Sequence, residues 1–209
     1  MTVLSQEQKI KLIKLLKQNK FSEIEFEIES ISSFKDRSPF LANMLGVVKL
    51  KRASSTKKDF EEARLLFKDS YEKDPNYIDA MCNLGHVSIK LRNFEYIFKD
   101  LKRFKKEKGY NAKVNETLAR IFFFIGEINE ALTLYMEMVD KGDLSQNASA
   151  HFLCSLNYSY KLSQKEYLQY CKKINEKFKP DNFQDQINYE FEKNPENLSI
   201  GFISPDFVE

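Results

Sequence analysis

The sequence has few residues that interrupt helices. Its 209 residues include only 6 glycines and 5 prolines. A sheet-rich protein needs turn residues about every 8–12 positions, and this chain does not supply them. The scarcity favours helix, and 42% hydrophobic residues with 18 Phe and 10 Tyr are enough to build a core.

An excess of charge of one sign is also missing. The 33 basic and 31 acidic residues leave a formal charge of +2. Such a balance provides no strong field for nucleic acid or an anionic membrane, and no apolar run approaches the ~18 residues that span a bilayer. Residues 1–20 interleave lysines with apolar residues, unlike a signal peptide. We expect a cytoplasmic protein with neither nucleic acid nor membrane as a partner.

Residues that carry chemistry are few. The three cysteines, Cys82, Cys154 and Cys171, are far apart and form no Cys-x-x-Cys pair. The only histidines, His86 and His151, have no acidic or cysteine cluster at ligand spacing around them, and no glycine-rich phosphate loop is recognisable. We therefore expect no catalytic residue, no metal and no cofactor.

A pattern repeats along the chain. Leu84-Gly85 lie in one amphipathic stretch, and Ile97, Leu101 and Phe104 lie in the next. Thirty-four residues later the same positions are held by Leu118-Ala119 and by Ala131, Tyr135 and Met138. An earlier copy at Leu45-Gly46 is offset by 39 residues, because five extra residues separate its two helices.

This period resembles that of the tetratricopeptide repeat, a pair of helices whose small residues permit close contact. The resemblance implies packing roles for one set of residues: Gly46, Gly85 and Ala119 on first helices, Ala63 and Ala131 on second helices, and Pro75 as a helix stop. Each pair has an apolar face that it cannot bury alone, so neighbouring pairs must stack.

The fold class expected is all-α: a right-handed superhelical solenoid of tetratricopeptide-type helix pairs with a short strand-like C-terminal tail. Residues 1–145 hold about four pairs, 146–180 a degenerate capping pair, and 181–209 a linker and the start of another domain. A loop around Ala53 to Lys57 should protrude.

The first repeat is the least regular. Ser5 and Gln8 have capping-box spacing, and Ile10, Ile13 and Leu16 recur at helical spacing. The following EIEFEIESI alternates as a strand would, but the 34-residue frame places Ile24, Ile28 and Ile31 at second-helix positions. We prefer the helix.

The C-terminal stretch carries a second resemblance. Residues 198–204 alternate as a short strand, and Leu156-Asn157-Tyr158 and Ile200–Phe207 resemble O-GlcNAc transferase-like, SPINDLY-type bacterial proteins. The resemblance implies that a glycosyltransferase domain, with a catalytically important His, would follow Phe207. The first 209 residues are expected to have no transferase activity alone. The asparagine ladder of related eukaryotic transferases is matched by Asn83 but not by Met44 or Thr117.

Helical phase assigns a groove to the inner faces of three consecutive first helices. Its residues are Asn43, Val47, Asp79, Cys82, His86, Lys113, Glu116, Arg120 and Phe123. This mixed lining suits an extended peptide, with Phe123 as its apolar anchor. His86 is more often a satisfied groove or core histidine than a ligand contact, and Cys82 a packing residue than a nucleophile.

Two further features have a structural and a functional interpretation. The basic run of residues 99–108 is typical of a solvated outer face, although it could attract an anionic partner. Phe122-Phe123-Phe124 could stack on bases, but three consecutive helical residues point three ways and at least one should enter the core. We favour packing.

Two functions remain. One is a non-catalytic peptide-binding module that recognises substrates for an O-GlcNAc transferase-like enzyme. The other is a free-standing scaffold that assembles protein complexes. Pairing of two copies through the repeats is left open.

Overall fold

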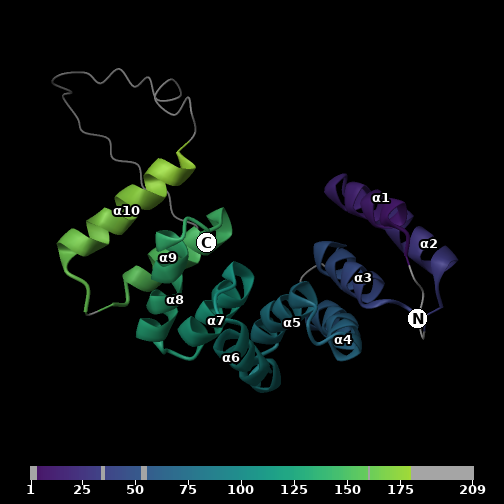
Figure 1. Cartoon of the computed structure of the whole chain (residues 1–209), viewed down its shortest axis with the longest axis horizontal. Helices are drawn as coiled ribbons and strands as arrows, with labels where there is room; N and C mark the ends of the chain where they lie inside the picture. The colour runs from purple at the N-terminus through teal and green to yellow at the C-terminus, as the bar shows by residue number, and fades with distance from the viewer. Residues whose placement is uncertain (1–3, 34–35, 53–55, 160, 180–209) are drawn as a thin grey trace, which may run out of the picture.

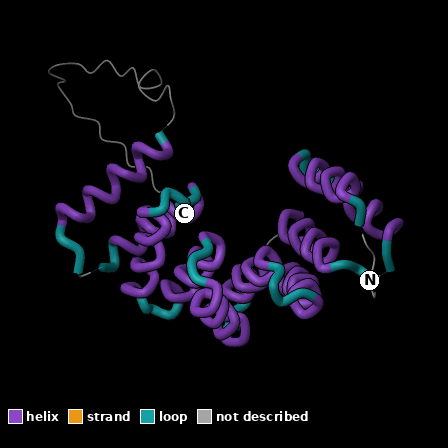
Figure 2. Tube along the Cα trace, viewed as in Figure 1, coloured by secondary structure: helices purple, strands orange, loops and turns teal. Residues whose placement is uncertain are grey.

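The computed structural model describes residues 4–33, 36–52, 56–159 and 161–179. These residues form ten α-helices and no strand (Figure 2). The helices are α1 (Gln6–Lys17), α2 (Phe21–Ile31), α3 (Pro39–Arg52), α4 (Lys57–Lys73), α5 (Ile78–Lys90), α6 (Glu95–Lys108), α7 (Ala112–Phe124), α8 (Ile128–Asp140), α9 (Gln146–Leu156) and α10 (Gln164–Phe178). The predicted all-α solenoid is confirmed. The expected strand at 198–204 and residues 53–55 of the expected loop lie outside the described residues.

Consecutive helices form five pairs that stack in chain order into an arc (Figure 1). The first helices α3, α5, α7 and α9 contact one another in series, whereas α4 and α6 lie on the outer side of the arc. From Ile78 to Ala112, and again from Ala112 to Gln146, the first helices begin 34 residues apart. The sequence period is therefore the stacking period of the structure.

The core has two parts. A small N-terminal cluster consists of Leu4, Leu12, Ile24, Ile28, Leu41, Met44, Leu45 and Val48. A second cluster runs continuously from Ala63 of α4 to Ile174 of α10. Every pair from α3 onward contributes to packing against this continuous core, as expected of a stack of repeats.

Helix α1 forms as predicted, and the structure shows which of its apolar residues enter the core. Ile10 and Ile13 are 57% and 41% exposed, while Leu12 is fully buried. The segment has apolar residues on more than one side, and the neighbouring helices decide which side becomes core. Helical spacing alone does not make that choice.

The strand alternative for the second segment is wrong. Residues 21–31 form α2, in which Ile24 and Ile28 are fully buried and Phe26 is 74% exposed. A strand would place all three on one face, whereas a helix separates Phe26 from the i, i+4 pair.

Two glycines lie at close contacts between helices. A Cβ at Gly46 would lie 2.5 Å from the Phe67 ring of α4, the second helix of the same pair. At Gly85 the nearest atom is the Thr117 methyl at 2.5 Å, on the first helix of the next pair, and Leu101 of α6 is 3.4 Å away. Gly46 thus lets the second helix of its own pair approach closely. Gly85 mainly lets the first helix of the following pair approach. Ala63, Ala119 and Ala131 are fully buried.

Helix ends follow local sequence. Ser5 and Gln8 form the predicted capping box, and the same motif begins α4 and α10. Asp74 caps the C-terminus of α4, and the exposed Pro75 follows it, where proline prevents the helix from continuing.

Candidate peptide-binding groove

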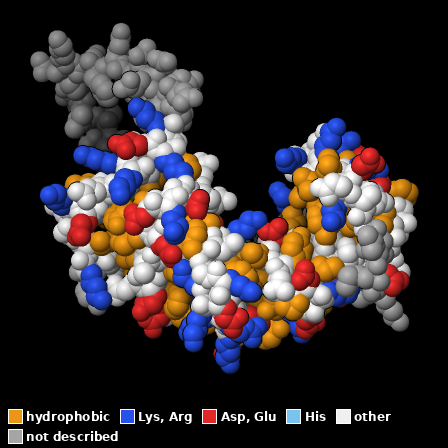
Figure 3. All heavy atoms as spheres, in the orientation of Figure 1, with side chains coloured by type: hydrophobic (Ala, Val, Ile, Leu, Met, Phe, Trp, Pro, Cys, Tyr) orange, Lys and Arg blue, Asp and Glu red, His pale blue; other side chains and the backbone are white. Residues whose placement is uncertain are grey.

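The nine residues predicted to line a groove come from α3, α5 and α7, on the inner side of the arc. Figure 3 shows this side as the hollow between the two arms of the molecule. Asp79 and Lys113 have the most exposed side chains, at 43% and 65%. Five are partly buried: Val47, His86, Glu116, Arg120 and Phe123. Asn43 and Cys82 are only 7% and 3% exposed, so they form the wall beneath the surface.

Polar contacts join successive first helices across the groove. Asn83 Nδ2 donates to Asn43 Oδ1 at 2.9 Å, and Asn43 Nδ2 donates to Tyr77 Oη at 3.4 Å. Farther along, Lys113 Nζ donates to Asp79 Oδ1 at 2.5 Å. In the sequence analysis, the asparagine-ladder position of α3 is occupied by Met44. The asparagine that contacts Asn83 is Asn43, one residue earlier. These contacts fix the register of α3, α5 and α7.

His86 is a satisfied groove residue. Its Nε2 lies 3.1 Å from Thr117 Oγ1, which donates to the Lys113 carbonyl oxygen. Burial, followed by the charges of Arg120 and His151, lowers the pKa of His86 to about 3. The imidazole is therefore neutral near pH 7 and acts as a hydrogen-bonding group.

The Cys82 thiol is a packing group. It is 3% exposed, and burial is the main cause that raises its pKa to about 12. A thiol in this state has almost no thiolate at neutral pH, and thiolate is the nucleophilic form. This agrees with the packing interpretation of the sequence.

A pocket of about 230 Å³ lies at the C-terminal ends of α5 and α7, where α8 and α9 close it. Its lining residues are Ile89, Lys90, Arg120, Phe123, Phe124, Tyr135 and His151. Of these, only Arg120 and Phe123 were predicted as groove residues. Tyr135 was missed because its second-helix position has core spacing, and His151 because it lies beyond the three helices considered.

The rings of Phe122, Phe123 and Phe124 point three ways. They meet Phe98, Tyr158 and Phe94, respectively, in edge-on contacts with centroids 5.3, 5.7 and 5.5 Å apart. The expectation that one of the three becomes a core residue is wrong, because Ile121 is fully buried and none of the three is. The Phe122 and Phe123 rings instead pack against the edge of the core, as the packing interpretation required, while Phe124 is 44% exposed.

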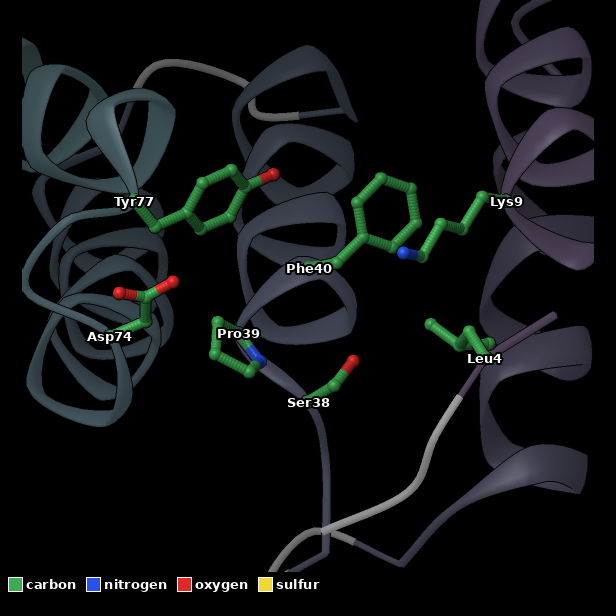
Figure 4. Close-up of a pocket in the computed structure, with 7 residues that line it drawn as sticks. All are labelled: Leu4, Lys9, Ser38, Pro39, Phe40, Asp74 and Tyr77. Carbon is green, nitrogen blue, oxygen red and sulfur yellow. The ribbon is translucent and has the colours of Figure 1, made fainter. Parts of the chain in front are cut away.

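A second pocket, of about 350 Å³, lies at the N-terminal ends of α1 and α3, next to the residue before α5. In Figure 4 the Lys9 side chain extends from α1 toward the Phe40 ring, with Tyr77 on the other side of Phe40. None of the nine predicted residues lines it. Aromatic residues shortly after Pro39 and Pro75 were the signal available in the sequence.

The basic run of α6 behaves as an outer face. Lys105 pairs with Glu137 at 2.6 Å and Arg103 with Asp100 at 2.7 Å, while Lys102 lies 5.1 Å from the Phe98 ring centroid. Across the described ranges, no group of three or more potential metal ligands is found. None of the helices described is long and apolar enough to cross a membrane.

No family model and no curated protein matches this sequence. Solved structures do. MamA AMB-1 is 16% identical with a TM-score of 0.56, over 81% of this chain and 96% of that one. MamA 41-end from Desulfovibrio magneticus RS-1 is 10% identical with a TM-score of 0.57, over 90% and 100%. TTC0263, a thermophilic TPR protein in Thermus thermophilus, is 17% identical with a TM-score of 0.57, over 71% and 79%.

The chain has a tetratricopeptide-type fold. Identities this low establish the fold alone and transfer neither partner nor activity. The groove on the inner side of α3, α5 and α7 is the surface from which a function can be argued.

Proposed function

We propose that this chain is a non-catalytic scaffold that binds an extended peptide segment of a partner protein along the inner side of α3, α5 and α7. The observation that carries the proposal is that residues of the predicted groove are joined from one first helix to the next and end at a pocket. The floor of the proposed groove is held by contacts between successive first helices, such as Asn43 with Asn83, and the groove leads into the pocket beside Phe123.

The groove chemistry suits a peptide. Exposed Asp79 and Lys113 offer charged partners, and His86 and Glu116 are partly exposed polar groups. Phe123 adds an aromatic surface, which serves as an anchor in many protein interfaces. Such a mixture matches a chain with backbone polar groups and one apolar side chain.

The finer form of the proposal is that these repeats recognise substrates for an O-GlcNAc transferase-like enzyme in the cytoplasm. It is supported by the resemblance of Ile200–Phe207, which lies outside the described residues, and of Leu156-Asn157-Tyr158. Leu156 is buried, and Asn157 accepts a hydrogen bond from Tyr167 at 3.0 Å. We expect no turnover of a nucleotide sugar by the 209 residues alone, and turnover by a longer chain if a transferase domain follows. A longer chain without such a domain would favour the free-standing scaffold.

Binding can be tested with the full 209-residue chain on an array of random 12-residue peptides. We expect a subset of peptides to bind, and Phe123→Ala together with Lys113→Ala to weaken that binding at least about tenfold. The matched control is Arg103→Gln on the outer side of α6, where the side chain is 61% exposed. Binding that survives the groove changes but is lost in the control would place the site elsewhere.

A further inference from the structure

The pocket beside Phe123 contains a buried polar group without a partner. Tyr135 of α8 is fully buried and lines this pocket, and within the described part of the chain its hydroxyl forms no hydrogen bond. An unpaired buried hydroxyl costs a fold about 1–3 kcal/mol. Burial raises the pKa of Tyr135, so the group stays protonated and can donate a hydrogen bond.

Cationic side chains line the same pocket. Arg120 of α7 is partly buried, and Lys90 is an exposed side chain at the end of α5. His151, in the middle of α9, also lines the pocket, but burial, followed by the charges of Arg120 and Lys90, lowers its pKa, so its imidazole is neutral near pH 7. Among the described residues, neither Arg120 nor Lys90 forms an ion pair, in contrast to Lys105 and Lys113. The pocket therefore combines positive charge with an unused hydroxyl donor.

The acidic residue of α7, Glu116, does not supply an acceptor for these donors. Glu116 precedes Arg120 by one turn, but its Oε2 accepts from the Ser145 hydroxyl at 3.4 Å. The remaining walls are apolar: Ile89, Phe123 and Phe124. A cavity of about 230 Å³ has room for one side chain, and its donors require that side chain to be an acceptor.

Resting on the proposed peptide binding, we propose that this pocket selects peptides carrying an internal Glu or Asp, whose carboxylate accepts from Arg120 and from the Tyr135 hydroxyl. A carboxylate has acceptor sites for both donors, and charge-assisted bonds to arginine are the stronger kind. Lys90 adds positive charge at the rim. Phe123 and Phe124 contact the methylene groups of the side chain.

The test uses pairs of array peptides that bind the wild-type chain and differ only by Glu→Gln at one internal position. For pairs in which that residue occupies the pocket, we expect the Glu member to bind about tenfold more tightly at low salt and the ratio to fall as salt rises. Equal binding in every pair would overturn the acidic pocket and leave peptide binding intact. Absence of any peptide binding would instead overturn the proposed function as well.

Two substitutions separate recognition from folding. Arg120→Gln should reduce the Glu-to-Gln ratio to about one, whereas Arg103→Gln should leave it unchanged. Tyr135→Phe should reduce the ratio at least about threefold without lowering the melting temperature, because it removes an unpaired hydroxyl. A merely structural tyrosine would leave the ratio as it is, and that result would overturn the role of the hydroxyl.

A second set of binding measurements identifies the source of the carboxylate. The same Glu peptides are compared with a free and with an amidated C-terminus. We expect equal affinity, because the internal side chain enters the pocket. A ratio that disappears on amidation would overturn the proposal in favour of a terminal carboxylate. Tighter binding of phosphoserine than of Glu at the same position would overturn it in favour of phosphate.

Discussion

The N-terminal helix pair and the middle of the solenoid bury their first helices to different extents. Helix α1 has one fully buried residue, Leu12, whereas α5 buries residues on nearly every side, from Ala80 to Ile89. Helix α5 contacts α3, α4, α6 and α7, while the main contacts of α1 are with α2. The comparison shows that the extent to which a first helix is buried depends more on its neighbours in the stack than on its own sequence.

The largest expected effect is on core leucines. Leu84→Ala should lower the free energy of unfolding by about 2–5 kcal/mol, because Leu84 is 3% exposed among four neighbouring helices. Leu12→Ala should fall at the low end of that range, since α1 can move to fill the space. Urea unfolding followed by far-UV circular dichroism measures both. An equal or larger loss for Leu12→Ala would contradict the view that α1 gains less of its burial from neighbouring helices than α5 does.

The next effect concerns the two buried glycines. Gly46→Ala should destabilise by about 1–3 kcal/mol, because the added methyl meets the ring of the fully buried Phe67. Gly85→Ala should cost less, since its closest neighbour is a single methyl group of Thr117.

The Gly85 change has a matched rescue. Thr117→Ser removes the obstructing methyl and keeps the hydroxyl that contacts His86 and the Lys113 carbonyl. Melting temperatures of the single and double variants should show recovery with Thr117→Ser. A double variant as unstable as the sum of its parts would mean that the clash lies elsewhere.

A pH-dependent effect is expected within the central repeats. Glu137 accepts from Lys105 at 2.6 Å and from buried Asn115 at 2.8 Å, and the bond from Lys105 is the main cause that lowers its pKa. A carboxyl with a lowered folded-state pKa stabilises fully above its ordinary pKa of ~4.3, and this stabilisation is lost as pH falls through the folded-state value. The difference in urea midpoint between wild type and Glu137→Gln should therefore shrink as pH falls below ~4.3. A difference that does not shrink at any pH below that value would refute this linkage.

The smallest effect is expected in the groove. Lys113→Ala breaks an exposed ion pair with Asp79 and should change the free energy of unfolding by about 0.5 kcal/mol or less, decreasing with salt. A loss above about 1 kcal/mol would show that this contact supports the stack as well as the surface. Thermal unfolding at two salt concentrations measures it.

The sequence predicted the stack because its period leaves direct traces. Gly46, Gly85 and Ala119 recur where the helices approach, and all three are buried. The buried face of α1 was not predictable, because its apolar residues lie on several sides and the neighbouring helices select among them. Helical phase also selected α3, α5 and α7 for the proposed groove, but not the depth of each residue. Asn43 and Cys82 lie in the wall, while Tyr135 reaches the pocket from the second helix behind it.

The aromatic run at the end of α7, residues 122–124, limits which segments of the solenoid can be replaced or deleted. Phe122 and Phe124 meet rings at Phe98 and Phe94 in the preceding repeat, and Phe123 meets Tyr158 beyond the following first helix. A graft or deletion of one 34-residue unit would leave some of these rings without partners. The block from Phe94 to Tyr158 keeps all three ring contacts together, so shuffled chimeras should tolerate boundaries outside that block better than boundaries within it.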